Sequence, residues 1–225
     1  LDGKEIIRKS MTEELDRAIE ALARAREGKK VALISSGDAG VYGMGGPTFE
    51  VLMQAGWTPP EVTIETDEEG NEQRIVGDGI EVEIIPGASA LNSCAALVGA
   101  PLTHDFCSIS LSDLLTPWEI IQERAELAAK GDFVAALYNP RSHKRVGQIN
   151  AVQDIFLRYR SPETPVGVVT GASRDNEAVL ISTLGHFTNE DINMFSLVII
   201  GNSKTRSVGD WMITPRGYQK REPGL

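Results

Sequence analysis

A short loop of small residues with one carboxylate follows the first apolar run of the chain. Residues 31–34 are apolar and are succeeded by Ser-Ser-Gly-Asp-Ala-Gly-Val-Tyr-Gly at 35–43. Glycine lets the backbone approach a bound molecule closely, and the Asp38 carboxylate can accept hydrogen bonds from an amine or a hydroxyl. Because open α/β sheets bind ligands at the carboxyl ends of their strands, the loop indicates a ligand site. The alternative is structural, with Asp38 capping the helix that follows.

Three further loops have the same position after an apolar run. Ile-Pro-Gly-Ala-Ser-Ala at 85–90 offers backbone N–H groups that suit a carboxylate or a ribose oxygen. Leu-Tyr-Asn-Pro-Arg at 137–141 ends a run in a ring, an amide and a cation, a combination that packing seldom requires. Val-Thr-Gly-Ala-Ser-Arg at 169–174 is another small-residue loop. Together the four loops predict a binding site built at strand ends.

The elements that would carry these loops alternate along the chain. Helical periodicity predicts helices at residues 12–27, 43–54, 89–97, 117–130 and 146–158, and apolar runs predict strands at residues 31–35, 81–85, 107–111, 133–138, 166–170, 179–183 and 195–200. Residues 62–64 and 74–76 flank an acidic segment with Gly70-Asn71 inside it, which predicts a hairpin. The alternation predicts an α/β fold of two domains with mostly parallel sheets, divided into residues 1–111 and 112–225.

Composition limits the possible partners. The chain has 225 residues and a net charge of −10, and its excess of acidic side chains lies entirely in residues 1–108. A negative chain without a basic, aromatic-rich stripe is unsuited to nucleic acid. No apolar run reaches the roughly 18 residues of a membrane span, so we expect no membrane partner and a cytoplasmic protein. Cys94 and Cys107 lack the number and spacing for disulfides or a metal site, so we expect two buried thiols and no metal.

The order of the motifs resembles the tetrapyrrole methylases. The motifs are Ser-Gly-Asp-x-x-x-Tyr-Gly at 36–43, Ile-Pro-Gly-Ala-Ser-Ala at 85–90, Pro-Leu-Thr-His at 101–104, Leu-Tyr-Asn-Pro-Arg at 137–141 and Phe-Ser-Leu-Val-Ile-Ile-Gly-Asn at 195–202. The resemblance spans about residues 30–205 and implies a two-domain α/β methyltransferase with S-adenosylmethionine in a cleft between the domains. Within the family it is greatest to enzymes that methylate C(17) of a precorrin-3B or cobalt-factor III tetrapyrrole, with ring contraction, in cobalamin (vitamin B12) biosynthesis.

The resemblance also implies which residues contact the ligands. S-adenosylmethionine, which leaves as S-adenosylhomocysteine, would contact Ser36, Gly37, Asp38, Val41, Tyr42, Ser89, Ala90, Asn139 and Ala172. The carboxylates of a tetrapyrrole substrate require cations, for which we expect Arg141 first and then Arg174. His104 is a further candidate for substrate contact or proton transfer, although a histidine at a helix end or satisfied between the domains fits the same pattern. No general acid or base can be assigned, and a homodimer is expected because it is common among such proteins.

Two features depart from the family pattern. The family usually begins with a strand and a Gly-x-Gly-Pro-Gly loop that the sequence does not contain, so the first domain is expected to lack one strand. The acidic hairpin within residues 57–80 is expected to be a surface insertion. Two alternatives therefore stay open. One is another member of the fold that acts at a different position or on a protein or ribosomal RNA, and the other is a metabolite-binding module without catalysis.

Overall fold

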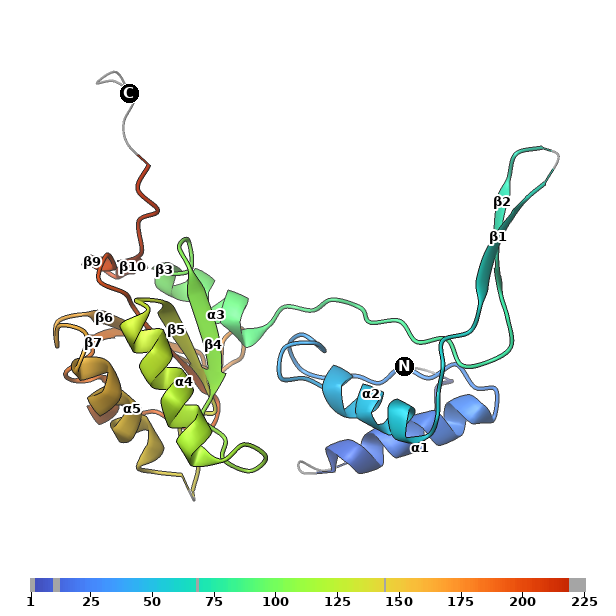
Figure 1. Cartoon of the computed structure of the whole chain (residues 1–225), viewed down its shortest axis with the longest axis horizontal. Coiled ribbons are helices and arrows are strands. Elements are labelled where there is room, and N and C mark those ends of the chain that lie inside the picture. Colours follow the sequence, from blue (N-terminus) through green and yellow to red (C-terminus); the bar gives the residue numbers. More distant parts are fainter. Residues whose placement is uncertain (1–2, 10–12, 68, 144, 219–225) are drawn as a thin grey trace. The chain divides into compact units, whose positions relative to one another are not determined.

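The computed structural model describes residues 3–9, 13–67, 69–143 and 145–218, which form two compact units (Figure 1). The first unit is Leu1–Ser89 and the second is Ala90–Leu225. The division expected from the sequence assigns residues 90–111 to the first domain. In the structure, α3 (Ala90–Val98) packs against the strands of the second unit, so this segment is counted there.

A five-stranded sheet forms the centre of the second unit. Its strands run in the order β4-β5-β8-β6-β7, and they are β4 (Phe106–Ser110), β5 (Val134–Tyr138), β6 (Pro165–Thr170), β7 (Ala178–Thr183) and β8 (Ser196–Ile200). β4 and β5 are parallel, whereas β8 is antiparallel to both its neighbours and β7 is antiparallel to β6. The α/β prediction is confirmed, but the sheet is mixed rather than mostly parallel. The link from β6 to β7 is too short for a crossover, so the chain reverses there, and β8 keeps the reversed direction.

Helices cover both faces of this sheet. On one face α4 (Trp118–Lys130) and α5 (Gln148–Leu157) bury a cluster that includes Val198. On the other face Val98 of α3 packs in a second cluster with Leu197. Because Leu197 and Val198 are consecutive residues of β8, the strand supplies both clusters in alternation, as the pleat of a strand requires.

A smaller sheet lies beside the second cluster. It consists of β3 (Gly99–Ala100), β10 (Trp211–Ile213) and β9 (Arg206–Val208), in that order, with Met212 of β10 fully buried in the cluster. A short 3₁₀ helix, η1 (Phe187–Asn189), lies between β7 and β8. The predicted strands at 107–111, 133–138, 166–170, 179–183 and 195–200 are thus confirmed within a residue or two at their ends.

The first unit contains two helices around a small core. α1 (Glu14–Arg26) and α2 (Gly45–Gln54) pack against each other, and the core includes Ala18 and Val51. Both helices confirm the predicted segments, although Thr12, the expected first residue of α1, lies outside the described residues.

The acidic segment forms the predicted hairpin. β1 (Val62–Thr66) and β2 (Glu72–Val76) pair antiparallel, and Figure 1 shows them extending away from α1 and α2. At the tip the Asp67 carboxylate accepts a hydrogen bond from the backbone N–H of Asn71 at 2.8 Å, and Gly70 has a φ of 85°. The turn is therefore held by its own side chains, as its sequence indicates.

Two predicted strands of the first unit are not strands in the structure. Residues 31–35 and 81–85 have no ladder partner among the described residues and belong to no sheet. A strand is defined by the hydrogen bonds to a neighbouring strand, so apolar composition alone does not form one. Both segments instead line a cavity of about 730 Å³ together with residues of α1 and α2, such as Leu22 and Leu52.

Among the described residues, no helix combines the length and the hydropathy that a membrane crossing requires.

Candidate functional site

In the first unit, Asp38 joins two of the predicted ligand loops. Its Oδ1 accepts a hydrogen bond from the Gly40 backbone N–H at 2.8 Å, and its Oδ2 accepts one from the Gly87 backbone N–H at 2.9 Å. Gly40 belongs to the loop that contains Asp38, whereas Gly87 belongs to the loop at 85–90. α2 begins at Gly45 after Met44, with no side-chain cap, so Asp38 does not cap that helix. The carboxylate fixes one loop against the other.

The same hydrogen bonds set the charge of Asp38. The N–H groups of Gly87 and then Gly40 favour the anionic form and lower the pKa of the carboxyl below its ordinary value. Asp38 is therefore ionised at neutral pH. Each carboxylate oxygen has two acceptor positions, so the group can still accept hydrogen bonds from a ligand amine or hydroxyl.

The two loops approach each other so closely that they require glycine. A Cβ added at Gly87 would overlap the Gly37 carbonyl oxygen and would lie 3.2 Å from the Asp38 Cα. Gly37 itself has a φ of 75°, a left-handed conformation that glycine adopts without strain. Backbone contact between the loops thus accounts for Gly87, and the left-handed conformation accounts for Gly37.

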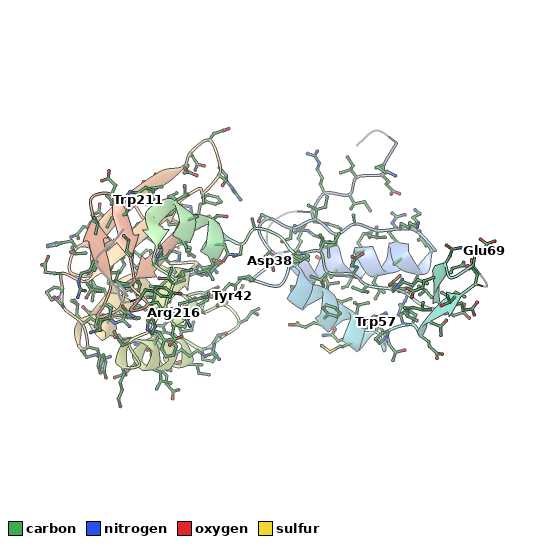
Figure 2. The ribbon with its side chains drawn as sticks, turned by 90° about the horizontal axis from the view of Figure 1, so that it is seen from above. Asp38, Tyr42, Trp57, Glu69, Trp211 and Arg216 are labelled. Atoms are coloured by element: carbon green, nitrogen blue, oxygen red, sulfur yellow. The ribbon has the colours of Figure 1, made fainter. Side chains whose placement is uncertain are left out.

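The remaining predicted residues of the first unit lie on or next to these loops. Figure 2 shows Asp38 and Tyr42 at the same end of the unit, away from Glu69 at the hairpin tip. Tyr42 has a φ of 52° and a side chain that is more than half exposed, whereas Ser89 is buried. Ser36 and Val41 are exposed. The loop therefore presents both polar and apolar groups beside a fixed carboxylate.

In the second unit, the carboxyl ends of β4, β5 and β6 lie at the same edge of the sheet. β4 is parallel to β5, with Ser110 opposite Tyr138. β8 pairs with both β5 and β6, and Val198 is the partner of Leu137 on one side and of Val168 on the other. β5 and β6 therefore run in the same direction at the same height. Asn139 and Thr170, each two residues further along, reach the same level. This edge carries the loops at 137–141 and 169–174 that the sequence predicts.

Asn139 is held by its neighbours in an unusual conformation. Its φ is 50°, and its side-chain amide donates a hydrogen bond to Ser110 Oγ at 2.9 Å. Ser110 is the last residue of β4. Tyr138, the residue before it, accepts a hydrogen bond from the Leu91 backbone N–H at 2.8 Å. Leu91 lies in the first turn of α3, directly after Ala90, so the Leu-Tyr-Asn motif holds the beginning of that helix.

The loop after β6 is held in a similar way. Gly171 and Ser173 both have positive φ values, 62° and 60°. The Ser173 backbone N–H donates to Glu177 Oε2 at 2.6 Å, and Ala172 packs against the second hydrophobic cluster. Arg174 is exposed, and its backbone N–H donates to the Gly171 carbonyl, which closes the turn.

His104 lies at the opposite end of β4 from this edge. It comes two residues before the strand begins, and its Nδ1 accepts a hydrogen bond from the Asp105 backbone N–H at 2.8 Å. The second unit thus brings Asn139, Ala172, Arg141 and Arg174 to loops at one edge of the sheet and places His104 at the other edge.

Three further residues hold the loops at this edge in place. Ser110 fixes the Asn139 side chain, Tyr138 holds α3, and Arg145 contacts the loops after β4 and β5. For Ser110 the sequence contains a signal, since the polar motif Ser-Leu-Ser-Asp at 110–113 lies at the end of β4, where polar side chains indicate a site. No local pattern indicates the partner of Arg145.

Neither cysteine is an activated nucleophile. Burial raises the pKa of the Cys94 thiol to about 11, and it also raises the pKa of the Cys107 thiol. Within the described ranges, no three His, Cys, Asp or Glu side chains gather as a metal ion would require.

Both the sequence and the fold are similar to those of known proteins. Residues 66–188 match the family model of Tetrapyrrole (Corrin/Porphyrin) Methylases. The chain is 52% identical to a cobalt-factor III methyltransferase of Priestia megaterium, over 98% of this chain and 38% of that protein. It is 43% identical to a probable cobalt-factor III C(17)-methyltransferase of Salmonella typhimurium, over 96% of this chain and 80% of that protein.

A solved structure of the methyltransferase CobJ has the same fold. It superposes with a TM-score of 0.82 at 37% sequence identity, covering 96% of this chain and 82% of that one. The chain thus spans most of CobJ and of the Salmonella relative but well under half of the Priestia protein.

Proposed function

Because this chain belongs to the tetrapyrrole (corrin/porphyrin) methylases, we propose that it methylates C(17) of a precorrin-3B or cobalt-factor III macrocycle, with ring contraction, in cobalamin biosynthesis. The observation that supports this most directly is the similarity, over nearly the whole chain, to the probable cobalt-factor III C(17)-methyltransferase of Salmonella typhimurium. The motif order at 36–43, 85–90 and 137–141 supports the same branch of the family.

The methyl donor in this proposal is S-adenosylmethionine. When bound, it supplies an electrophilic methyl group on a sulfonium, which a carbon of the macrocycle can accept in an in-line displacement. The chain needs no covalent nucleophile for such a transfer, and its two thiols, with raised pKa values, do not provide one. Its residues act by binding, alignment and exclusion of water.

In the first unit, we assign the methionine and ribose parts of the donor to the two loops joined by Asp38. Ser36, Gly37, Val41, Tyr42 and Ser89 lie on these loops, and Ala90 follows them in the chain. The arrangement fits the ligand because an ionised carboxylate, held in place by two backbone N–H groups, suits an amine or a ribose hydroxyl.

In the second unit, we assign the adenine to the edge that carries Asn139 and Ala172. Adenine requires a flat apolar surface with backbone donors and acceptors nearby. Ala172 is a small side chain packed on an apolar cluster, and the Asn139 side chain is fixed by Ser110 at the same edge of the sheet.

The substrate carboxylates are assigned to Arg141 and Arg174, at the same edge. Arg141 Nε is buried and has no hydrogen-bond partner among the described residues, so an anion near this guanidinium would offset its desolvation. His104 lies at the other edge and is left outside the proposed site.

We further propose that the protein is a homodimer and that it is located in the cytoplasm. The homodimer is supported by β7, an edge strand whose Val179 and Leu180 side chains are about two-fifths exposed. Light scattering of the purified protein tests it, and a mass of one chain would contradict it.

Calorimetry with S-adenosylhomocysteine is the first test of the function. We expect a micromolar dissociation constant, in the range usual for metabolite sites. The second test is incubation with cobalt-factor III and S-adenosylmethionine carrying a labelled methyl group, with NMR to locate the label. Label at C(17) is expected. Label at another carbon would favour a different member of the family, and absence of S-adenosylhomocysteine binding would refute the methyltransferase proposal.

A further inference from the structure

A polar cluster connects the loops after β4 and β5, and it extends from Asn139 to charged residues to which the proposed function gives no role. The members of this cluster, called the Arg145 cluster below, are Ser110, Ser112, Asp113, Asn139, Arg145 and Gln148. It joins the loop after β4, the loop after β5 and the first residue of α5.

Arg145 is the centre of the cluster. Its Nη1 donates to Ser112 Oγ at 3.4 Å, and its Nη2 donates to the Asn139 carbonyl oxygen at 3.5 Å. Its Nη1 also lies 3.9 Å from Asp113 Oδ1, and the side chain is only 16% exposed. A guanidinium offers several donors in a fixed planar arrangement, so a single Arg145 side chain can hold both loops at once.

The acidic partner is itself fixed. Gln148 Nε2 donates to Asp113 Oδ2 at 3.1 Å, and Gln148 begins α5. The backbone of Arg145 is also tied down, because its N–H donates to Ser142 Oγ at 3.1 Å and its carbonyl accepts from the Ser142 N–H at 3.0 Å. Hydrogen bonds therefore hold both the backbone and the guanidinium group of Arg145.

Asn139 needs such support. It has a φ of 50°, which is uncommon for a residue other than glycine. Pro140 follows it, and a residue before proline ordinarily adopts extended backbone. Conformations of this kind persist only where neighbouring groups determine them, and here Ser110 holds the side chain while Arg145 holds the carbonyl.

We propose that Arg145 is a positioning residue of the methyl-donor site, acting through the left-handed backbone of Asn139. The inference rests on the proposed function, since that function assigns the donor's adenine to Asn139. Arg145 would not touch the donor. It would fix the backbone angle at which Asn139 is presented.

The test is a double-mutant cycle with S-adenosylhomocysteine affinity as the readout. The variants are Arg145→Ala, Asn139→Gly and the double variant, with Arg158→Ala as the matched control. Arg158 is more than half exposed and pairs with Glu126, and it follows the last residue of α5, whereas the cluster member Gln148 is the first. We expect Arg145→Ala to weaken binding about tenfold, which is equivalent to about 1.4 kcal/mol, and Arg158→Ala to leave it unchanged.

Glycine at 139 separates positioning from general stability. Glycine adopts a positive φ without strain, so the backbone no longer needs the guanidinium. We therefore expect the double variant to bind no more weakly than Asn139→Gly alone. A merely structural Arg145 would lower affinity by the same factor in both backgrounds, and that result would overturn the inference.

A conservative variant tests the geometry and covers the case in which Arg145→Ala does not fold. Arg145→Lys keeps the charge but has one compact donor group, which cannot span both loops. We expect Arg145→Lys to bind S-adenosylhomocysteine several-fold more weakly than wild type. Combined with Asn139→Gly, it should bind no more weakly than Asn139→Gly alone. Wild-type affinity in Arg145→Lys would overturn the positioning role while the proposed function stands. If the wild-type protein does not bind S-adenosylhomocysteine, the proposed function fails and the inference fails with it.

Discussion

The contact between the two ligand loops of the first unit can be broken by a single methyl group. Gly87→Ala adds a Cβ that would overlap the Gly37 carbonyl oxygen and lie 3.1 Å from the Gly37 carbonyl carbon. These are backbone atoms, so no side-chain rotation can relieve the overlap. The loops must move apart, which lengthens the 2.9 Å hydrogen bond from the Gly87 N–H to Asp38 Oδ2.

The expected cost follows from this geometry. Adding a methyl group where the backbone must shift typically destabilises a protein by about 1–3 kcal/mol. For a chain of this size, that corresponds to a fall in the melting temperature of about 2–4 °C per kcal/mol. If the two loops bind the methyl donor, the same displacement also weakens S-adenosylhomocysteine binding, and we expect a loss of about tenfold or more because misplaced contacts are costly.

Gly46→Ala is the matched control. Gly46 lies in α2 with no atom within 4 Å of an added Cβ. Alanine there should change the free energy of unfolding by no more than about 0.5 kcal/mol and leave binding unchanged, because the added methyl group meets nothing. Thermal unfolding and calorimetry of both variants measure the two effects. A Gly87→Ala variant that melts and binds like wild type, or a Gly46→Ala variant that loses as much as Gly87→Ala, would refute the reasoning.

Two further predictions concern charged groups. The lowered pKa of Asp38 means that its contribution is present at neutral pH and is lost as the pH falls through that pKa, so wild-type S-adenosylhomocysteine affinity should decline in acid. Asp38→Asn should bind S-adenosylhomocysteine more weakly than wild type at neutral pH, and its affinity should not decline in acid. Calorimetry in which the affinities of the two proteins fall in parallel with pH would contradict this. Arg160 has a side chain that is 1% exposed and donates to the carbonyls of Gly201, Ala128 and Phe133. Arg160→Ala should lower the free energy of unfolding by about 3 kcal/mol or more, because a carbonyl that loses its donor costs about 1–3 kcal/mol. Urea unfolding measures that loss, and a loss no larger than that of Arg158→Ala would be the opposite result.

The sequence was most informative about the second unit. The apolar run at 133–138 is β5 (Val134–Tyr138), and its first four residues are fully buried, so composition alone identifies it. The prediction that polar motifs follow strand ends is confirmed for the loops at 137–141 and 169–174. The family resemblance drawn from the motifs is confirmed by the comparisons.

Long-range pairing was beyond the sequence. β8 is buried along its whole length, which predicts a central strand but not its antiparallel direction. Residues 31–35 have the composition of a strand, yet a ladder depends on a partner elsewhere in the chain. The contact between Asp38 and Gly87 joins residues 49 positions apart, so no local pattern indicates it.

Loops leave backbone groups without ladder partners, and in both units charged side chains take up some of those groups. In the first unit the Asp38 carboxylate accepts two backbone N–H bonds, whereas in the second unit the Arg145 guanidinium donates to a backbone carbonyl. A loop fixed in this way before the ligand arrives loses less conformational entropy on binding. Affinity should therefore depend on residues that do not touch the ligand. At Asn139 the fixation also holds a strained backbone, and the loss that comes from strain should disappear when glycine replaces Asn139.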